Sequence, residues 1–238
     1  MHAAIFDVDG TLLDSYGIDN SMYADAVRSA LGTVVIRDAW EKYARVTDTG
    51  VLADICSDNA LVYDGSVSTA VMNVYLSFLR SHMEAKGPYQ EIPGALQYLN
   101  TLRGRPDVRV AYATGGWRAT AEHKLTSAGF PLEGIPLASA DDYQDRTQIM
   151  LHALGQLEGP FTSVTYFGDG LWDRAAATQL GWEFVAVGPK LGGLSDFGAV
   201  PGTGGSELTA TKQPFAACGK LTPMFRISSR RLCRLIDR

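Results

Sequence analysis

Two acidic residues, Asp7 and Asp9, flank Val8 near the start of the chain and are followed by a Gly-Thr turn. Residues two apart in a strand face the same way, so both carboxylates can project toward one site at the tip of a strand. Carboxylates act as nucleophiles in phosphoryl transfer, and a neighbouring acid can protonate the leaving oxygen. The pair indicates this chemistry, although an isolated pair of this kind is as often a turn cap.

A second acidic pair, Asp169 and Asp173, occurs in the segment FGDGLWD, at the end of another apolar run and the start of a predicted helix. Carboxyl ends of parallel strands meet at one edge of a sheet, so this pair should converge with Asp7 and Asp9. Mg²⁺ prefers oxygen ligands and keeps several waters. The four carboxylates therefore predict a Mg²⁺ site, while Asp173 can equally complement a helix dipole.

Thr114 ends a third apolar run and is followed by Gly115 and Gly116. Two glycines before a helix let backbone N–H groups approach an anion, and the threonine hydroxyl can join them. We interpret Thr114 and Gly115 as phosphate-binding residues, with an ordinary turn as the alternative.

A cation is also needed to neutralise the phosphoryl oxygens during transfer. Arg146 immediately precedes a predicted helix, just upstream of the strand that carries Asp169. Lys124 falls within the predicted helix at 118–129, where a lysine most often lies on a solvated face. We therefore expect Arg146, and not Lys124, to supply the charge.

The elements that position these residues alternate along most of the chain. Apolar runs predict strands, and segments with helical spacing separate them. The strands are expected at 3–9, 108–115, 163–170 and 183–188, with a weaker one at 135–140, and the helices at 94–103, 118–129, 147–157 and 173–181. Such alternation predicts an α/β fold whose parallel sheet has helices on both faces and its ligand site beyond the strand ends.

Residues 15–89 interrupt this alternation with helical patterns only, predicted at 21–32, 37–48 and 66–85. An all-helical insertion after the first strand is most simply a lid over the strand ends. We expect residues 1–14 and 90–200 to form the catalytic core and 15–89 the cap.

The last segment, 201–238, carries seven Lys and Arg residues against two Asp and Glu. Its lack of helical or strand periodicity predicts a basic, disordered tail, with a basic docking segment as the alternative.

Composition limits the remaining possibilities. The chain has 238 residues, 46% of them hydrophobic, with a formal net charge of -5, so no overall basic field favours nucleic acid. Three cysteines without CxxC spacing argue against a disulfide framework and a zinc site. Neither a leader peptide nor a membrane span is apparent. We expect a cytoplasmic enzyme without nucleic-acid or membrane partners; exposed cap helices often pair, so a homodimer remains open.

The motifs DVDGTLLDS and GDGLWD, with Thr114 and Arg146 between them, resemble those of the haloacid dehalogenase-like (HAD) hydrolase superfamily over roughly residues 1–190. This resemblance implies a Rossmann-like parallel-sheet core with an inserted all-helical cap of the C1 type. It further implies Asp7 as nucleophile, Asp9 as general acid/base and Thr114 as a phosphate ligand. Mg²⁺ would be bound by Asp169 and the Asp9 main-chain carbonyl, with Asp173 as a direct ligand or support.

Arg146 departs from the resemblance, because the family usually has lysine there. Arginine keeps the charge but offers a planar fork that can position a nucleophile differently. The second acid, Asp9, favours phosphate esters over carbon-halogen bonds. We therefore expect a phosphatase acting on a small phosphorylated metabolite; a phosphomutase of the same superfamily and a catalytically silent binding or regulatory module are the alternatives.

Overall fold

The computed structural model of the chain describes residues 1–15 and 17–199, so the tail predicted at 201–238 lies outside the described residues. Within them, five strands form one parallel sheet in the order β3-β2-β1-β4-β5. The strands are β1 (His2–Phe6), β2 (Val108–Ala113), β3 (Leu137–Ala138), β4 (Ser163–Gly168) and β5 (Glu183–Ala186). The predicted parallel α/β sheet is confirmed, with the weak fifth segment reduced to two residues.

Two layers of helices cover the sheet, because successive strand residues face opposite sides. On one face, Phe6 packs with Tyr98 and Phe167, beneath α4 and α5; on the other, Ile5 packs with Tyr166, beneath α6 and α7. The helices are α4 (Ala95–Arg103), α5 (Arg118–Ser127), α6 (Arg146–Gly155) and α7 (Leu171–Leu180), with short 3-10 turns η2 (Pro189–Leu191) and η3 (Phe197–Ala199). The four helices predicted between the strands are confirmed.

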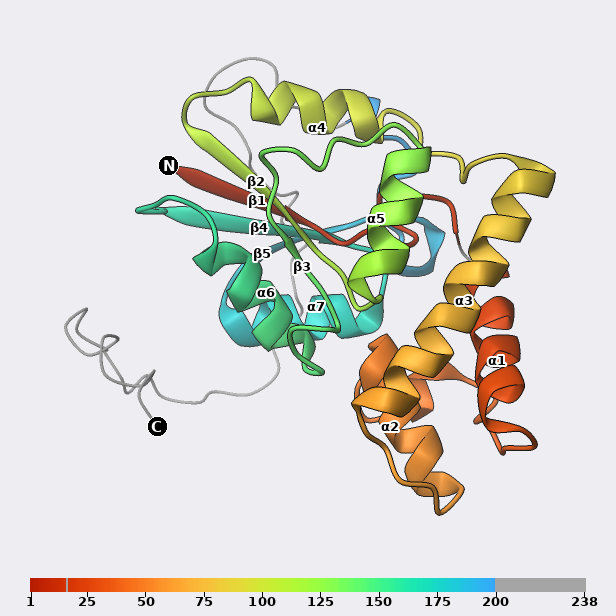
Figure 1. Cartoon of the computed structure of the whole chain (residues 1–238). Helices are drawn as coiled ribbons and strands as arrows, with labels where there is room; N and C mark the ends of the chain where they lie inside the picture. Colours follow the sequence, from red (N-terminus) through yellow and green to blue (C-terminus); the bar gives the residue numbers. More distant parts are fainter. Residues whose placement is uncertain (16, 200–238) are drawn as a thin grey trace, which may run out of the picture.

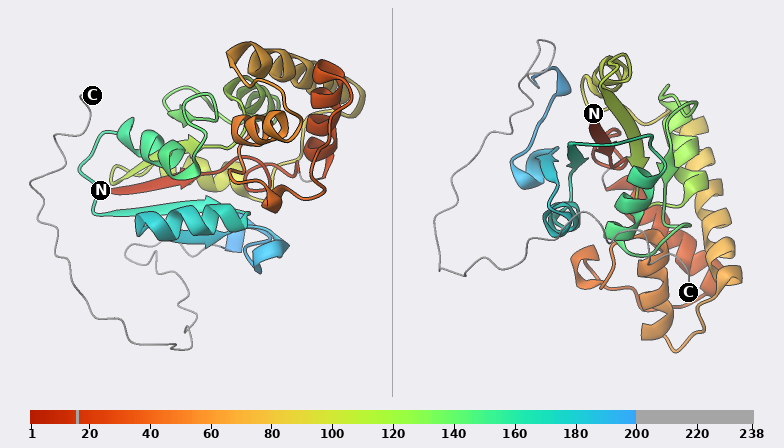
Figure 2. Two further views of the ribbon diagram at one scale, coloured as in Figure 1. Left: turned by 90° about the horizontal axis from the view of Figure 1, so that it is seen from below. Right: turned by 90° about the vertical axis from the view of Figure 1, so that its left-hand side faces the viewer.

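The insertion between β1 and β2 begins with α1 (Ile18–Leu31), α2 (Asp48–Asp58) and α3 (Gly65–Lys86). Figures 1 and 2 show these three helices grouped beyond the ends toward which the strands run. The arrangement places a helical layer over the edge of the sheet where the acidic motifs end.

One helix predicted in this insertion is wrong. The segment 37–48 contains only a 3-10 turn, η1 (Trp40–Lys42), and the α-helix starts at Asp48. Thr47 caps that helix, because its side-chain oxygen accepts the Gly50 N–H at 3.1 Å. A threonine cap satisfies an N–H that the first turn otherwise leaves without a partner, so it decides where the helix begins.

The insertion is hydrogen-bonded to the core close to the strand ends. The Asp48 N–H donates to the Gly115 carbonyl at 2.7 Å, and the Thr49 hydroxyl donates to the Ala140 carbonyl at 3.0 Å. Tyr23 of α1 stacks on Trp117, the N-cap residue of α5. These contacts hold the helical layer down on the core. In the described part of the chain, no helix has the length and apolar character that a membrane crossing requires.

Candidate functional site

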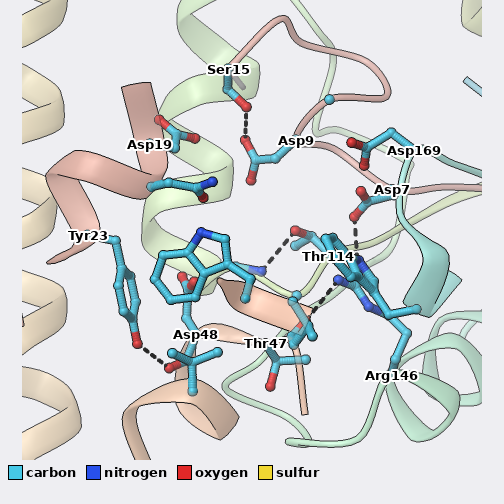
Figure 3. Close-up of a pocket in the computed structure, with 18 of the residues that line it drawn as sticks. Asp7, Asp9, Ser15, Asp19, Tyr23, Thr47, Asp48, Thr114, Arg146 and Asp169 are labelled. Carbon is cyan, nitrogen blue, oxygen red and sulfur yellow. Dashed lines mark hydrogen bonds and ion pairs between the residues drawn. The ribbon is translucent and has the colours of Figure 1, made fainter. Parts of the chain in front are cut away.

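Three neighbouring strands of the sheet end at one pocket. Asp7 follows β1, Thr114 follows β2 and Asp169 follows β4, and all three line a pocket of about 860 Å³, including its open mouth, between the sheet edge and the insertion. Figure 3 shows Asp7, Asp169 and Arg146 at one end of this pocket, and Asp19 and Tyr23 at the other. Because β1 lies between β2 and β4, the strand order itself brings the motifs together.

Asp7 is 3% exposed, and its main-chain N–H donates to the Phe167 carbonyl at 2.9 Å. Its Oδ1 accepts from the Arg146 Nη1 at 3.1 Å. Burial, together with the nearby charge of Asp173, raises the pKa of Asp7 well above its ordinary value, while Arg146 opposes that shift. Burial thus favours the neutral acid, and cationic partners are needed to keep Asp7 ionised.

Arg146 is the first residue of α6, where the Asp145 side chain caps the helix by accepting the N–H groups of Thr147 and Gln148. From that position the guanidinium reaches Asp7, and its Nε lies 3.5 Å from the Asp173 Oδ1. A Cβ added at Gly115 would lie 2.5 Å from the Arg146 Nη2, so only glycine permits this approach. The carboxylates of Asp173 and Asp7 outweigh burial and raise the pKa of Arg146.

Asp7, Asp169 and Asp173 each offer one carboxylate oxygen, and these oxygens all lie within 4.8 Å of one another. Burial and the charge of Asp173 raise the pKa of Asp169 to about 6. Buried like charges repel one another, and a bound cation would relieve that repulsion. Since the donors are all oxygens, the set fits Mg²⁺. The backbone at Gly10 passes close to the Asp169 carboxylate: a Cβ added at Gly10 would lie 2.5 Å from the Asp169 Oδ2.

Asp9 lies beside this group with its side chain partly exposed. Its Oδ1 accepts from Ser15 Oγ at 2.8 Å and from Lys124 Nζ at 2.5 Å. Burial raises the pKa of Asp9, but the Lys124 ammonium and the two hydrogen bonds outweigh it and leave the pKa below its ordinary value. The other oxygen lies on the Gly116 side of the pocket.

The expectation that Lys124 lies on a solvated helix face is wrong. Lys124 is 1% exposed, and its Nζ also contacts the Asp19 Oδ2 at 2.8 Å. Thr120, Ala121 and Leu125 of the same helix are buried with it. Only Ala121 and Leu125 of these are apolar, so the sequence of this helix carries no strong signal that Lys124 is buried. The pocket wall therefore contains a buried cation, Lys124, as well as the partly buried Arg146.

Thr114, which is 1% exposed, lies at the predicted place, and its hydroxyl oxygen accepts the Gly116 N–H at 3.0 Å. Gly115 lines the pocket beside it. The N–H of Trp117, which follows these glycines, donates to the Asp48 Oδ2 at 2.9 Å. A carboxylate of the insertion thus accepts a hydrogen bond from one of the N–H groups at the start of α5.

Asp19 and Asp48 are pocket residues that the sequence patterns do not single out. Burial raises the pKa of Asp48 to about 7, although the Trp117 N–H opposes that shift. Such a shift is common for a carboxyl group at a functional site. The Thr-Asp pair at 47–48 is itself a helix-start signal, and it would have located α2 and this acid.

Comparison with protein families identifies the family of this chain: residues 1–181 match the family of haloacid dehalogenase-like hydrolases. This chain belongs to that family. No curated protein matches the sequence. The match spans every pocket residue named above except Lys190 of η2, whose Nζ lies 3.4 Å from the Asp169 Oδ2.

Solved structures share the fold of this haloacid dehalogenase-like hydrolase at low sequence identity. CbbY from Rhodobacter sphaeroides, solved in complex with phosphate, is 20% identical with a TM-score of 0.62, over 82% of this chain and 88% of CbbY. A CbbY mutant with the same values was solved with xylulose-(1,5)bisphosphate. A hydrolase from Pseudomonas syringae is 19% identical with a TM-score of 0.61, over 78% of this chain and 84% of that one.

Proposed function

We propose that the chain is a Mg²⁺-dependent phosphomonoester hydrolase that acts on a small phosphorylated metabolite through an aspartyl-phosphate on Asp7. The observation that carries this proposal is the grouping of Asp7 with a cation, Arg146, and a second acid, Asp9, around one pocket. A nucleophile, a charge for the phosphoryl oxygens and a proton donor are the parts that this reaction needs. Family membership supports hydrolysis as the reaction type.

In the first step, one Asp7 carboxylate oxygen attacks phosphorus, and the bond from phosphorus to the ester oxygen breaks. The pairing with Lys124 lowers the pKa of Asp9, so Asp9 must first gain a proton as the ester binds; it then donates that proton to the departing oxygen, and the alcohol leaves uncharged. Arg146 and Thr114 bind the phosphoryl oxygens, where Arg146 balances charge in the transition state. Asp7 is then esterified, and Asp9 is ionised beside Lys124.

In the second step, the ionised Asp9 takes a proton from water as the water oxygen attacks phosphorus. The bond from phosphorus to the Asp7 oxygen breaks, which releases inorganic phosphate and restores both carboxyl groups. The hydrogen bonds from Lys124 and Ser15 fix the Asp9 carboxyl group through both steps.

Asp7 and Asp169 would hold Mg²⁺ with the Asp9 main-chain carbonyl, and Asp173 would support them. The ion would supply positive charge at the phosphoryl oxygens and at the nucleophile. Asp173 is fully buried, and its Oδ2 accepts the Gly170 N–H at 3.0 Å. These contacts favour a positioning role for Asp173, toward Arg146 and the acidic cluster.

A small substrate fits this pocket better than a macromolecule, because the insertion is hydrogen-bonded to the core above the strand ends. CbbY, which shares the fold, was solved with a sugar bisphosphate. We therefore place the substrate among phosphorylated sugars and metabolites of similar size.

The test is Mg²⁺-dependent release of p-nitrophenol from p-nitrophenyl phosphate by the purified chain. Asp7→Asn keeps the shape but removes the nucleophile, so kcat should fall by more than about a thousandfold with an unchanged circular dichroism spectrum. Acid quenching should trap hydroxylamine-sensitive phosphate on the natural chain only. Substantial Mg²⁺-dependent activity in a folded Asp7→Asn protein would falsify the assignment.

A further inference from the structure

The part of the pocket that faces the insertion differs in chemistry from the phosphoryl-binding end. Its lining comes from α1, η1, α2 and α3, and includes Tyr23 and Val51 as well as a group of acidic, aromatic and amide side chains. The members of that group are Asp19, Asn20, Trp40, Glu41, Asp48 and Tyr75. In the proposed reaction this region surrounds the leaving group, because Asp7 fixes the phosphorus at the opposite end (Figure 3).

Acids outnumber bases in the pocket wall. Among the described residues, the wall at the insertion end contains three carboxylates, from Asp19, Glu41 and Asp48, and one cation, Lys124; the carboxylates of Asp7 and Asp169 belong to the proposed Mg²⁺ site at the other end. Lys124 is itself shared between the carboxylates of Asp9 and Asp19, and Arg146 between those of Asp7 and Asp173. A second anionic group on a substrate would therefore face acids at the insertion end, and like charges at close range repel.

Three hydrogen bonds hold Asp48 in place. Its main-chain N–H donates to the Gly115 carbonyl at 2.7 Å, its carbonyl accepts the Tyr23 hydroxyl at 2.6 Å, and its Oδ2 accepts the Trp117 N–H at 2.9 Å. Burial already raises the pKa of this group to about 7. A desolvated carboxylate gains more from a bound cation than a solvated one does.

An aromatic ring stands beside these acids. Trp40 lines the pocket next to Glu41, and its ring is fixed edge-to-face against Tyr23, with centroids 5.4 Å apart. An aromatic face combined with carboxylates is a common arrangement for binding ammonium groups. A leaving group that carried only hydroxyl groups would gain nothing from the excess of negative charge at this end of the pocket.

We propose that the leaving group of the substrate carries a cationic amine, as in phosphate esters of amino alcohols and amino sugars, and that Asp48 and Glu41 select it. This inference rests on the proposed phosphatase function and makes it more specific. It also distinguishes the chain from CbbY, whose structure holds a bisphosphate.

The test compares kcat/KM, with Mg²⁺ present, for two matched series of esters. The first is O-phosphoethanolamine, 2-hydroxyethyl phosphate and phosphoglycolate, and the second is glucosamine 6-phosphate, glucose 6-phosphate and 6-phosphogluconate. Within at least one series we expect the amine to be best and the acid to be worst, with at least about a tenfold difference between them. If p-nitrophenyl phosphate is cleaved but kcat/KM is equal within both series, or is highest for the acids, the amine preference is refuted and the phosphatase function stands. If no ester is hydrolysed, p-nitrophenyl phosphate included, the proposed phosphatase function itself is refuted.

Two variants assign the selectivity to residues. Asp48→Asn keeps an acceptor for the Trp117 N–H but removes the charge, and Glu41→Gln changes an exposed residue without a packing cost. Each should lower the ratio of kcat/KM for the amine to that for the neutral ester by about threefold or more. Glu84→Gln, an exposed acid of α3 outside the pocket, is the matched control and should leave the ratio unchanged. An unchanged ratio in both pocket variants would refute the role of these acids.

Discussion

Arg146 contacts the proposed nucleophile and its neighbouring acid at once, with Nη1 3.1 Å from the Asp7 Oδ1 and Nε 3.5 Å from the Asp173 Oδ1. A lysine has a single ammonium group and no rigid fork. At this position, where the resemblance led us to expect a lysine, the arginine offers a geometry of its own. Gly115 makes room for the larger group.

Substitution of Arg146 by alanine should lower kcat/KM by about a hundredfold or more, because a cation near phosphorus acts in both the ground state and the transition state. Arg146→Lys should retain more activity, since it restores the charge. Steady-state kinetics with p-nitrophenyl phosphate, together with the inhibition constant for inorganic phosphate, measure both effects. If lysine is no better than alanine, the shape of the guanidinium, which bridges Asp7 and Asp173, and not its charge alone is what the site requires.

At the scale of elements, Lys124 links α5 to the insertion. Its Nζ contacts the Asp9 carboxylate of the core and the Asp19 carboxylate of α1. Asp19 also accepts a hydrogen bond, at 2.5 Å, from the hydroxyl of Tyr89, which lies in the segment where the chain returns to the core. The carboxylates of Asp19 and Asp9 outweigh burial and raise the pKa of Lys124 well above its ordinary value. One buried ammonium thus joins segments on both sides of the insertion.

Lys124→Met should lower the free energy of unfolding by about 2–4 kcal/mol, because the partly buried carboxylates of Asp9 and Asp19 lose their common cation. Urea denaturation at pH 7 measures the change. The double variant Lys124→Met/Asp19→Asn should recover part of the loss, since one of the two unpaired charges is then absent. Lys86→Met, at the exposed end of α3, is the control and should change stability by less than about 0.5 kcal/mol. A Lys124→Met protein as stable as the natural chain would contradict the pairing.

At the scale of the whole molecule, the described chain ends in a segment that packs against the sheet. Phe197 of η3 is 1% exposed and lies among Phe6, Tyr98 and Phe167, with ring centroids 5.4 to 6.3 Å away. Every pocket residue precedes it in the sequence. The part of the chain needed for folding should therefore extend through Phe197.

Truncation after residue 200 should leave kcat/KM within about twofold of the full chain, because the pocket and the sheet are intact. Truncation after residue 192 removes the Phe197 ring and should cost about 3 kcal/mol or more. Thermal unfolding and p-nitrophenyl phosphate hydrolysis of both proteins distinguish the two cases. An inactive or unfolded chain 1–200 would mean that the basic segment is required after all.

The sequence alone determined the α/β architecture, the positions of Asp7, Thr114 and Asp169 at the strand ends, and the position of Arg146 at the start of a helix. Apolar runs that end in acids or a Gly-rich turn are local signals, and the carboxyl ends of parallel strands share one edge. The chain order of strands and helices was therefore enough to predict which motifs would meet. Their chemical roles stay predictions until the variants are measured.

The tertiary structure decided which charges pair and what surrounds the leaving group. Lys124 meets Asp9 across 115 positions of sequence, and Asp48 meets Trp117 across 69. Contacts of this length leave no periodic trace, because the first depends on how α5 packs beside the end of β1 and the second on how the insertion lies on the core. The weakly amphipathic sequence of α5 does not reveal that Lys124 is buried, and only the tertiary structure brings Asp19 of α1 within reach of its ammonium group.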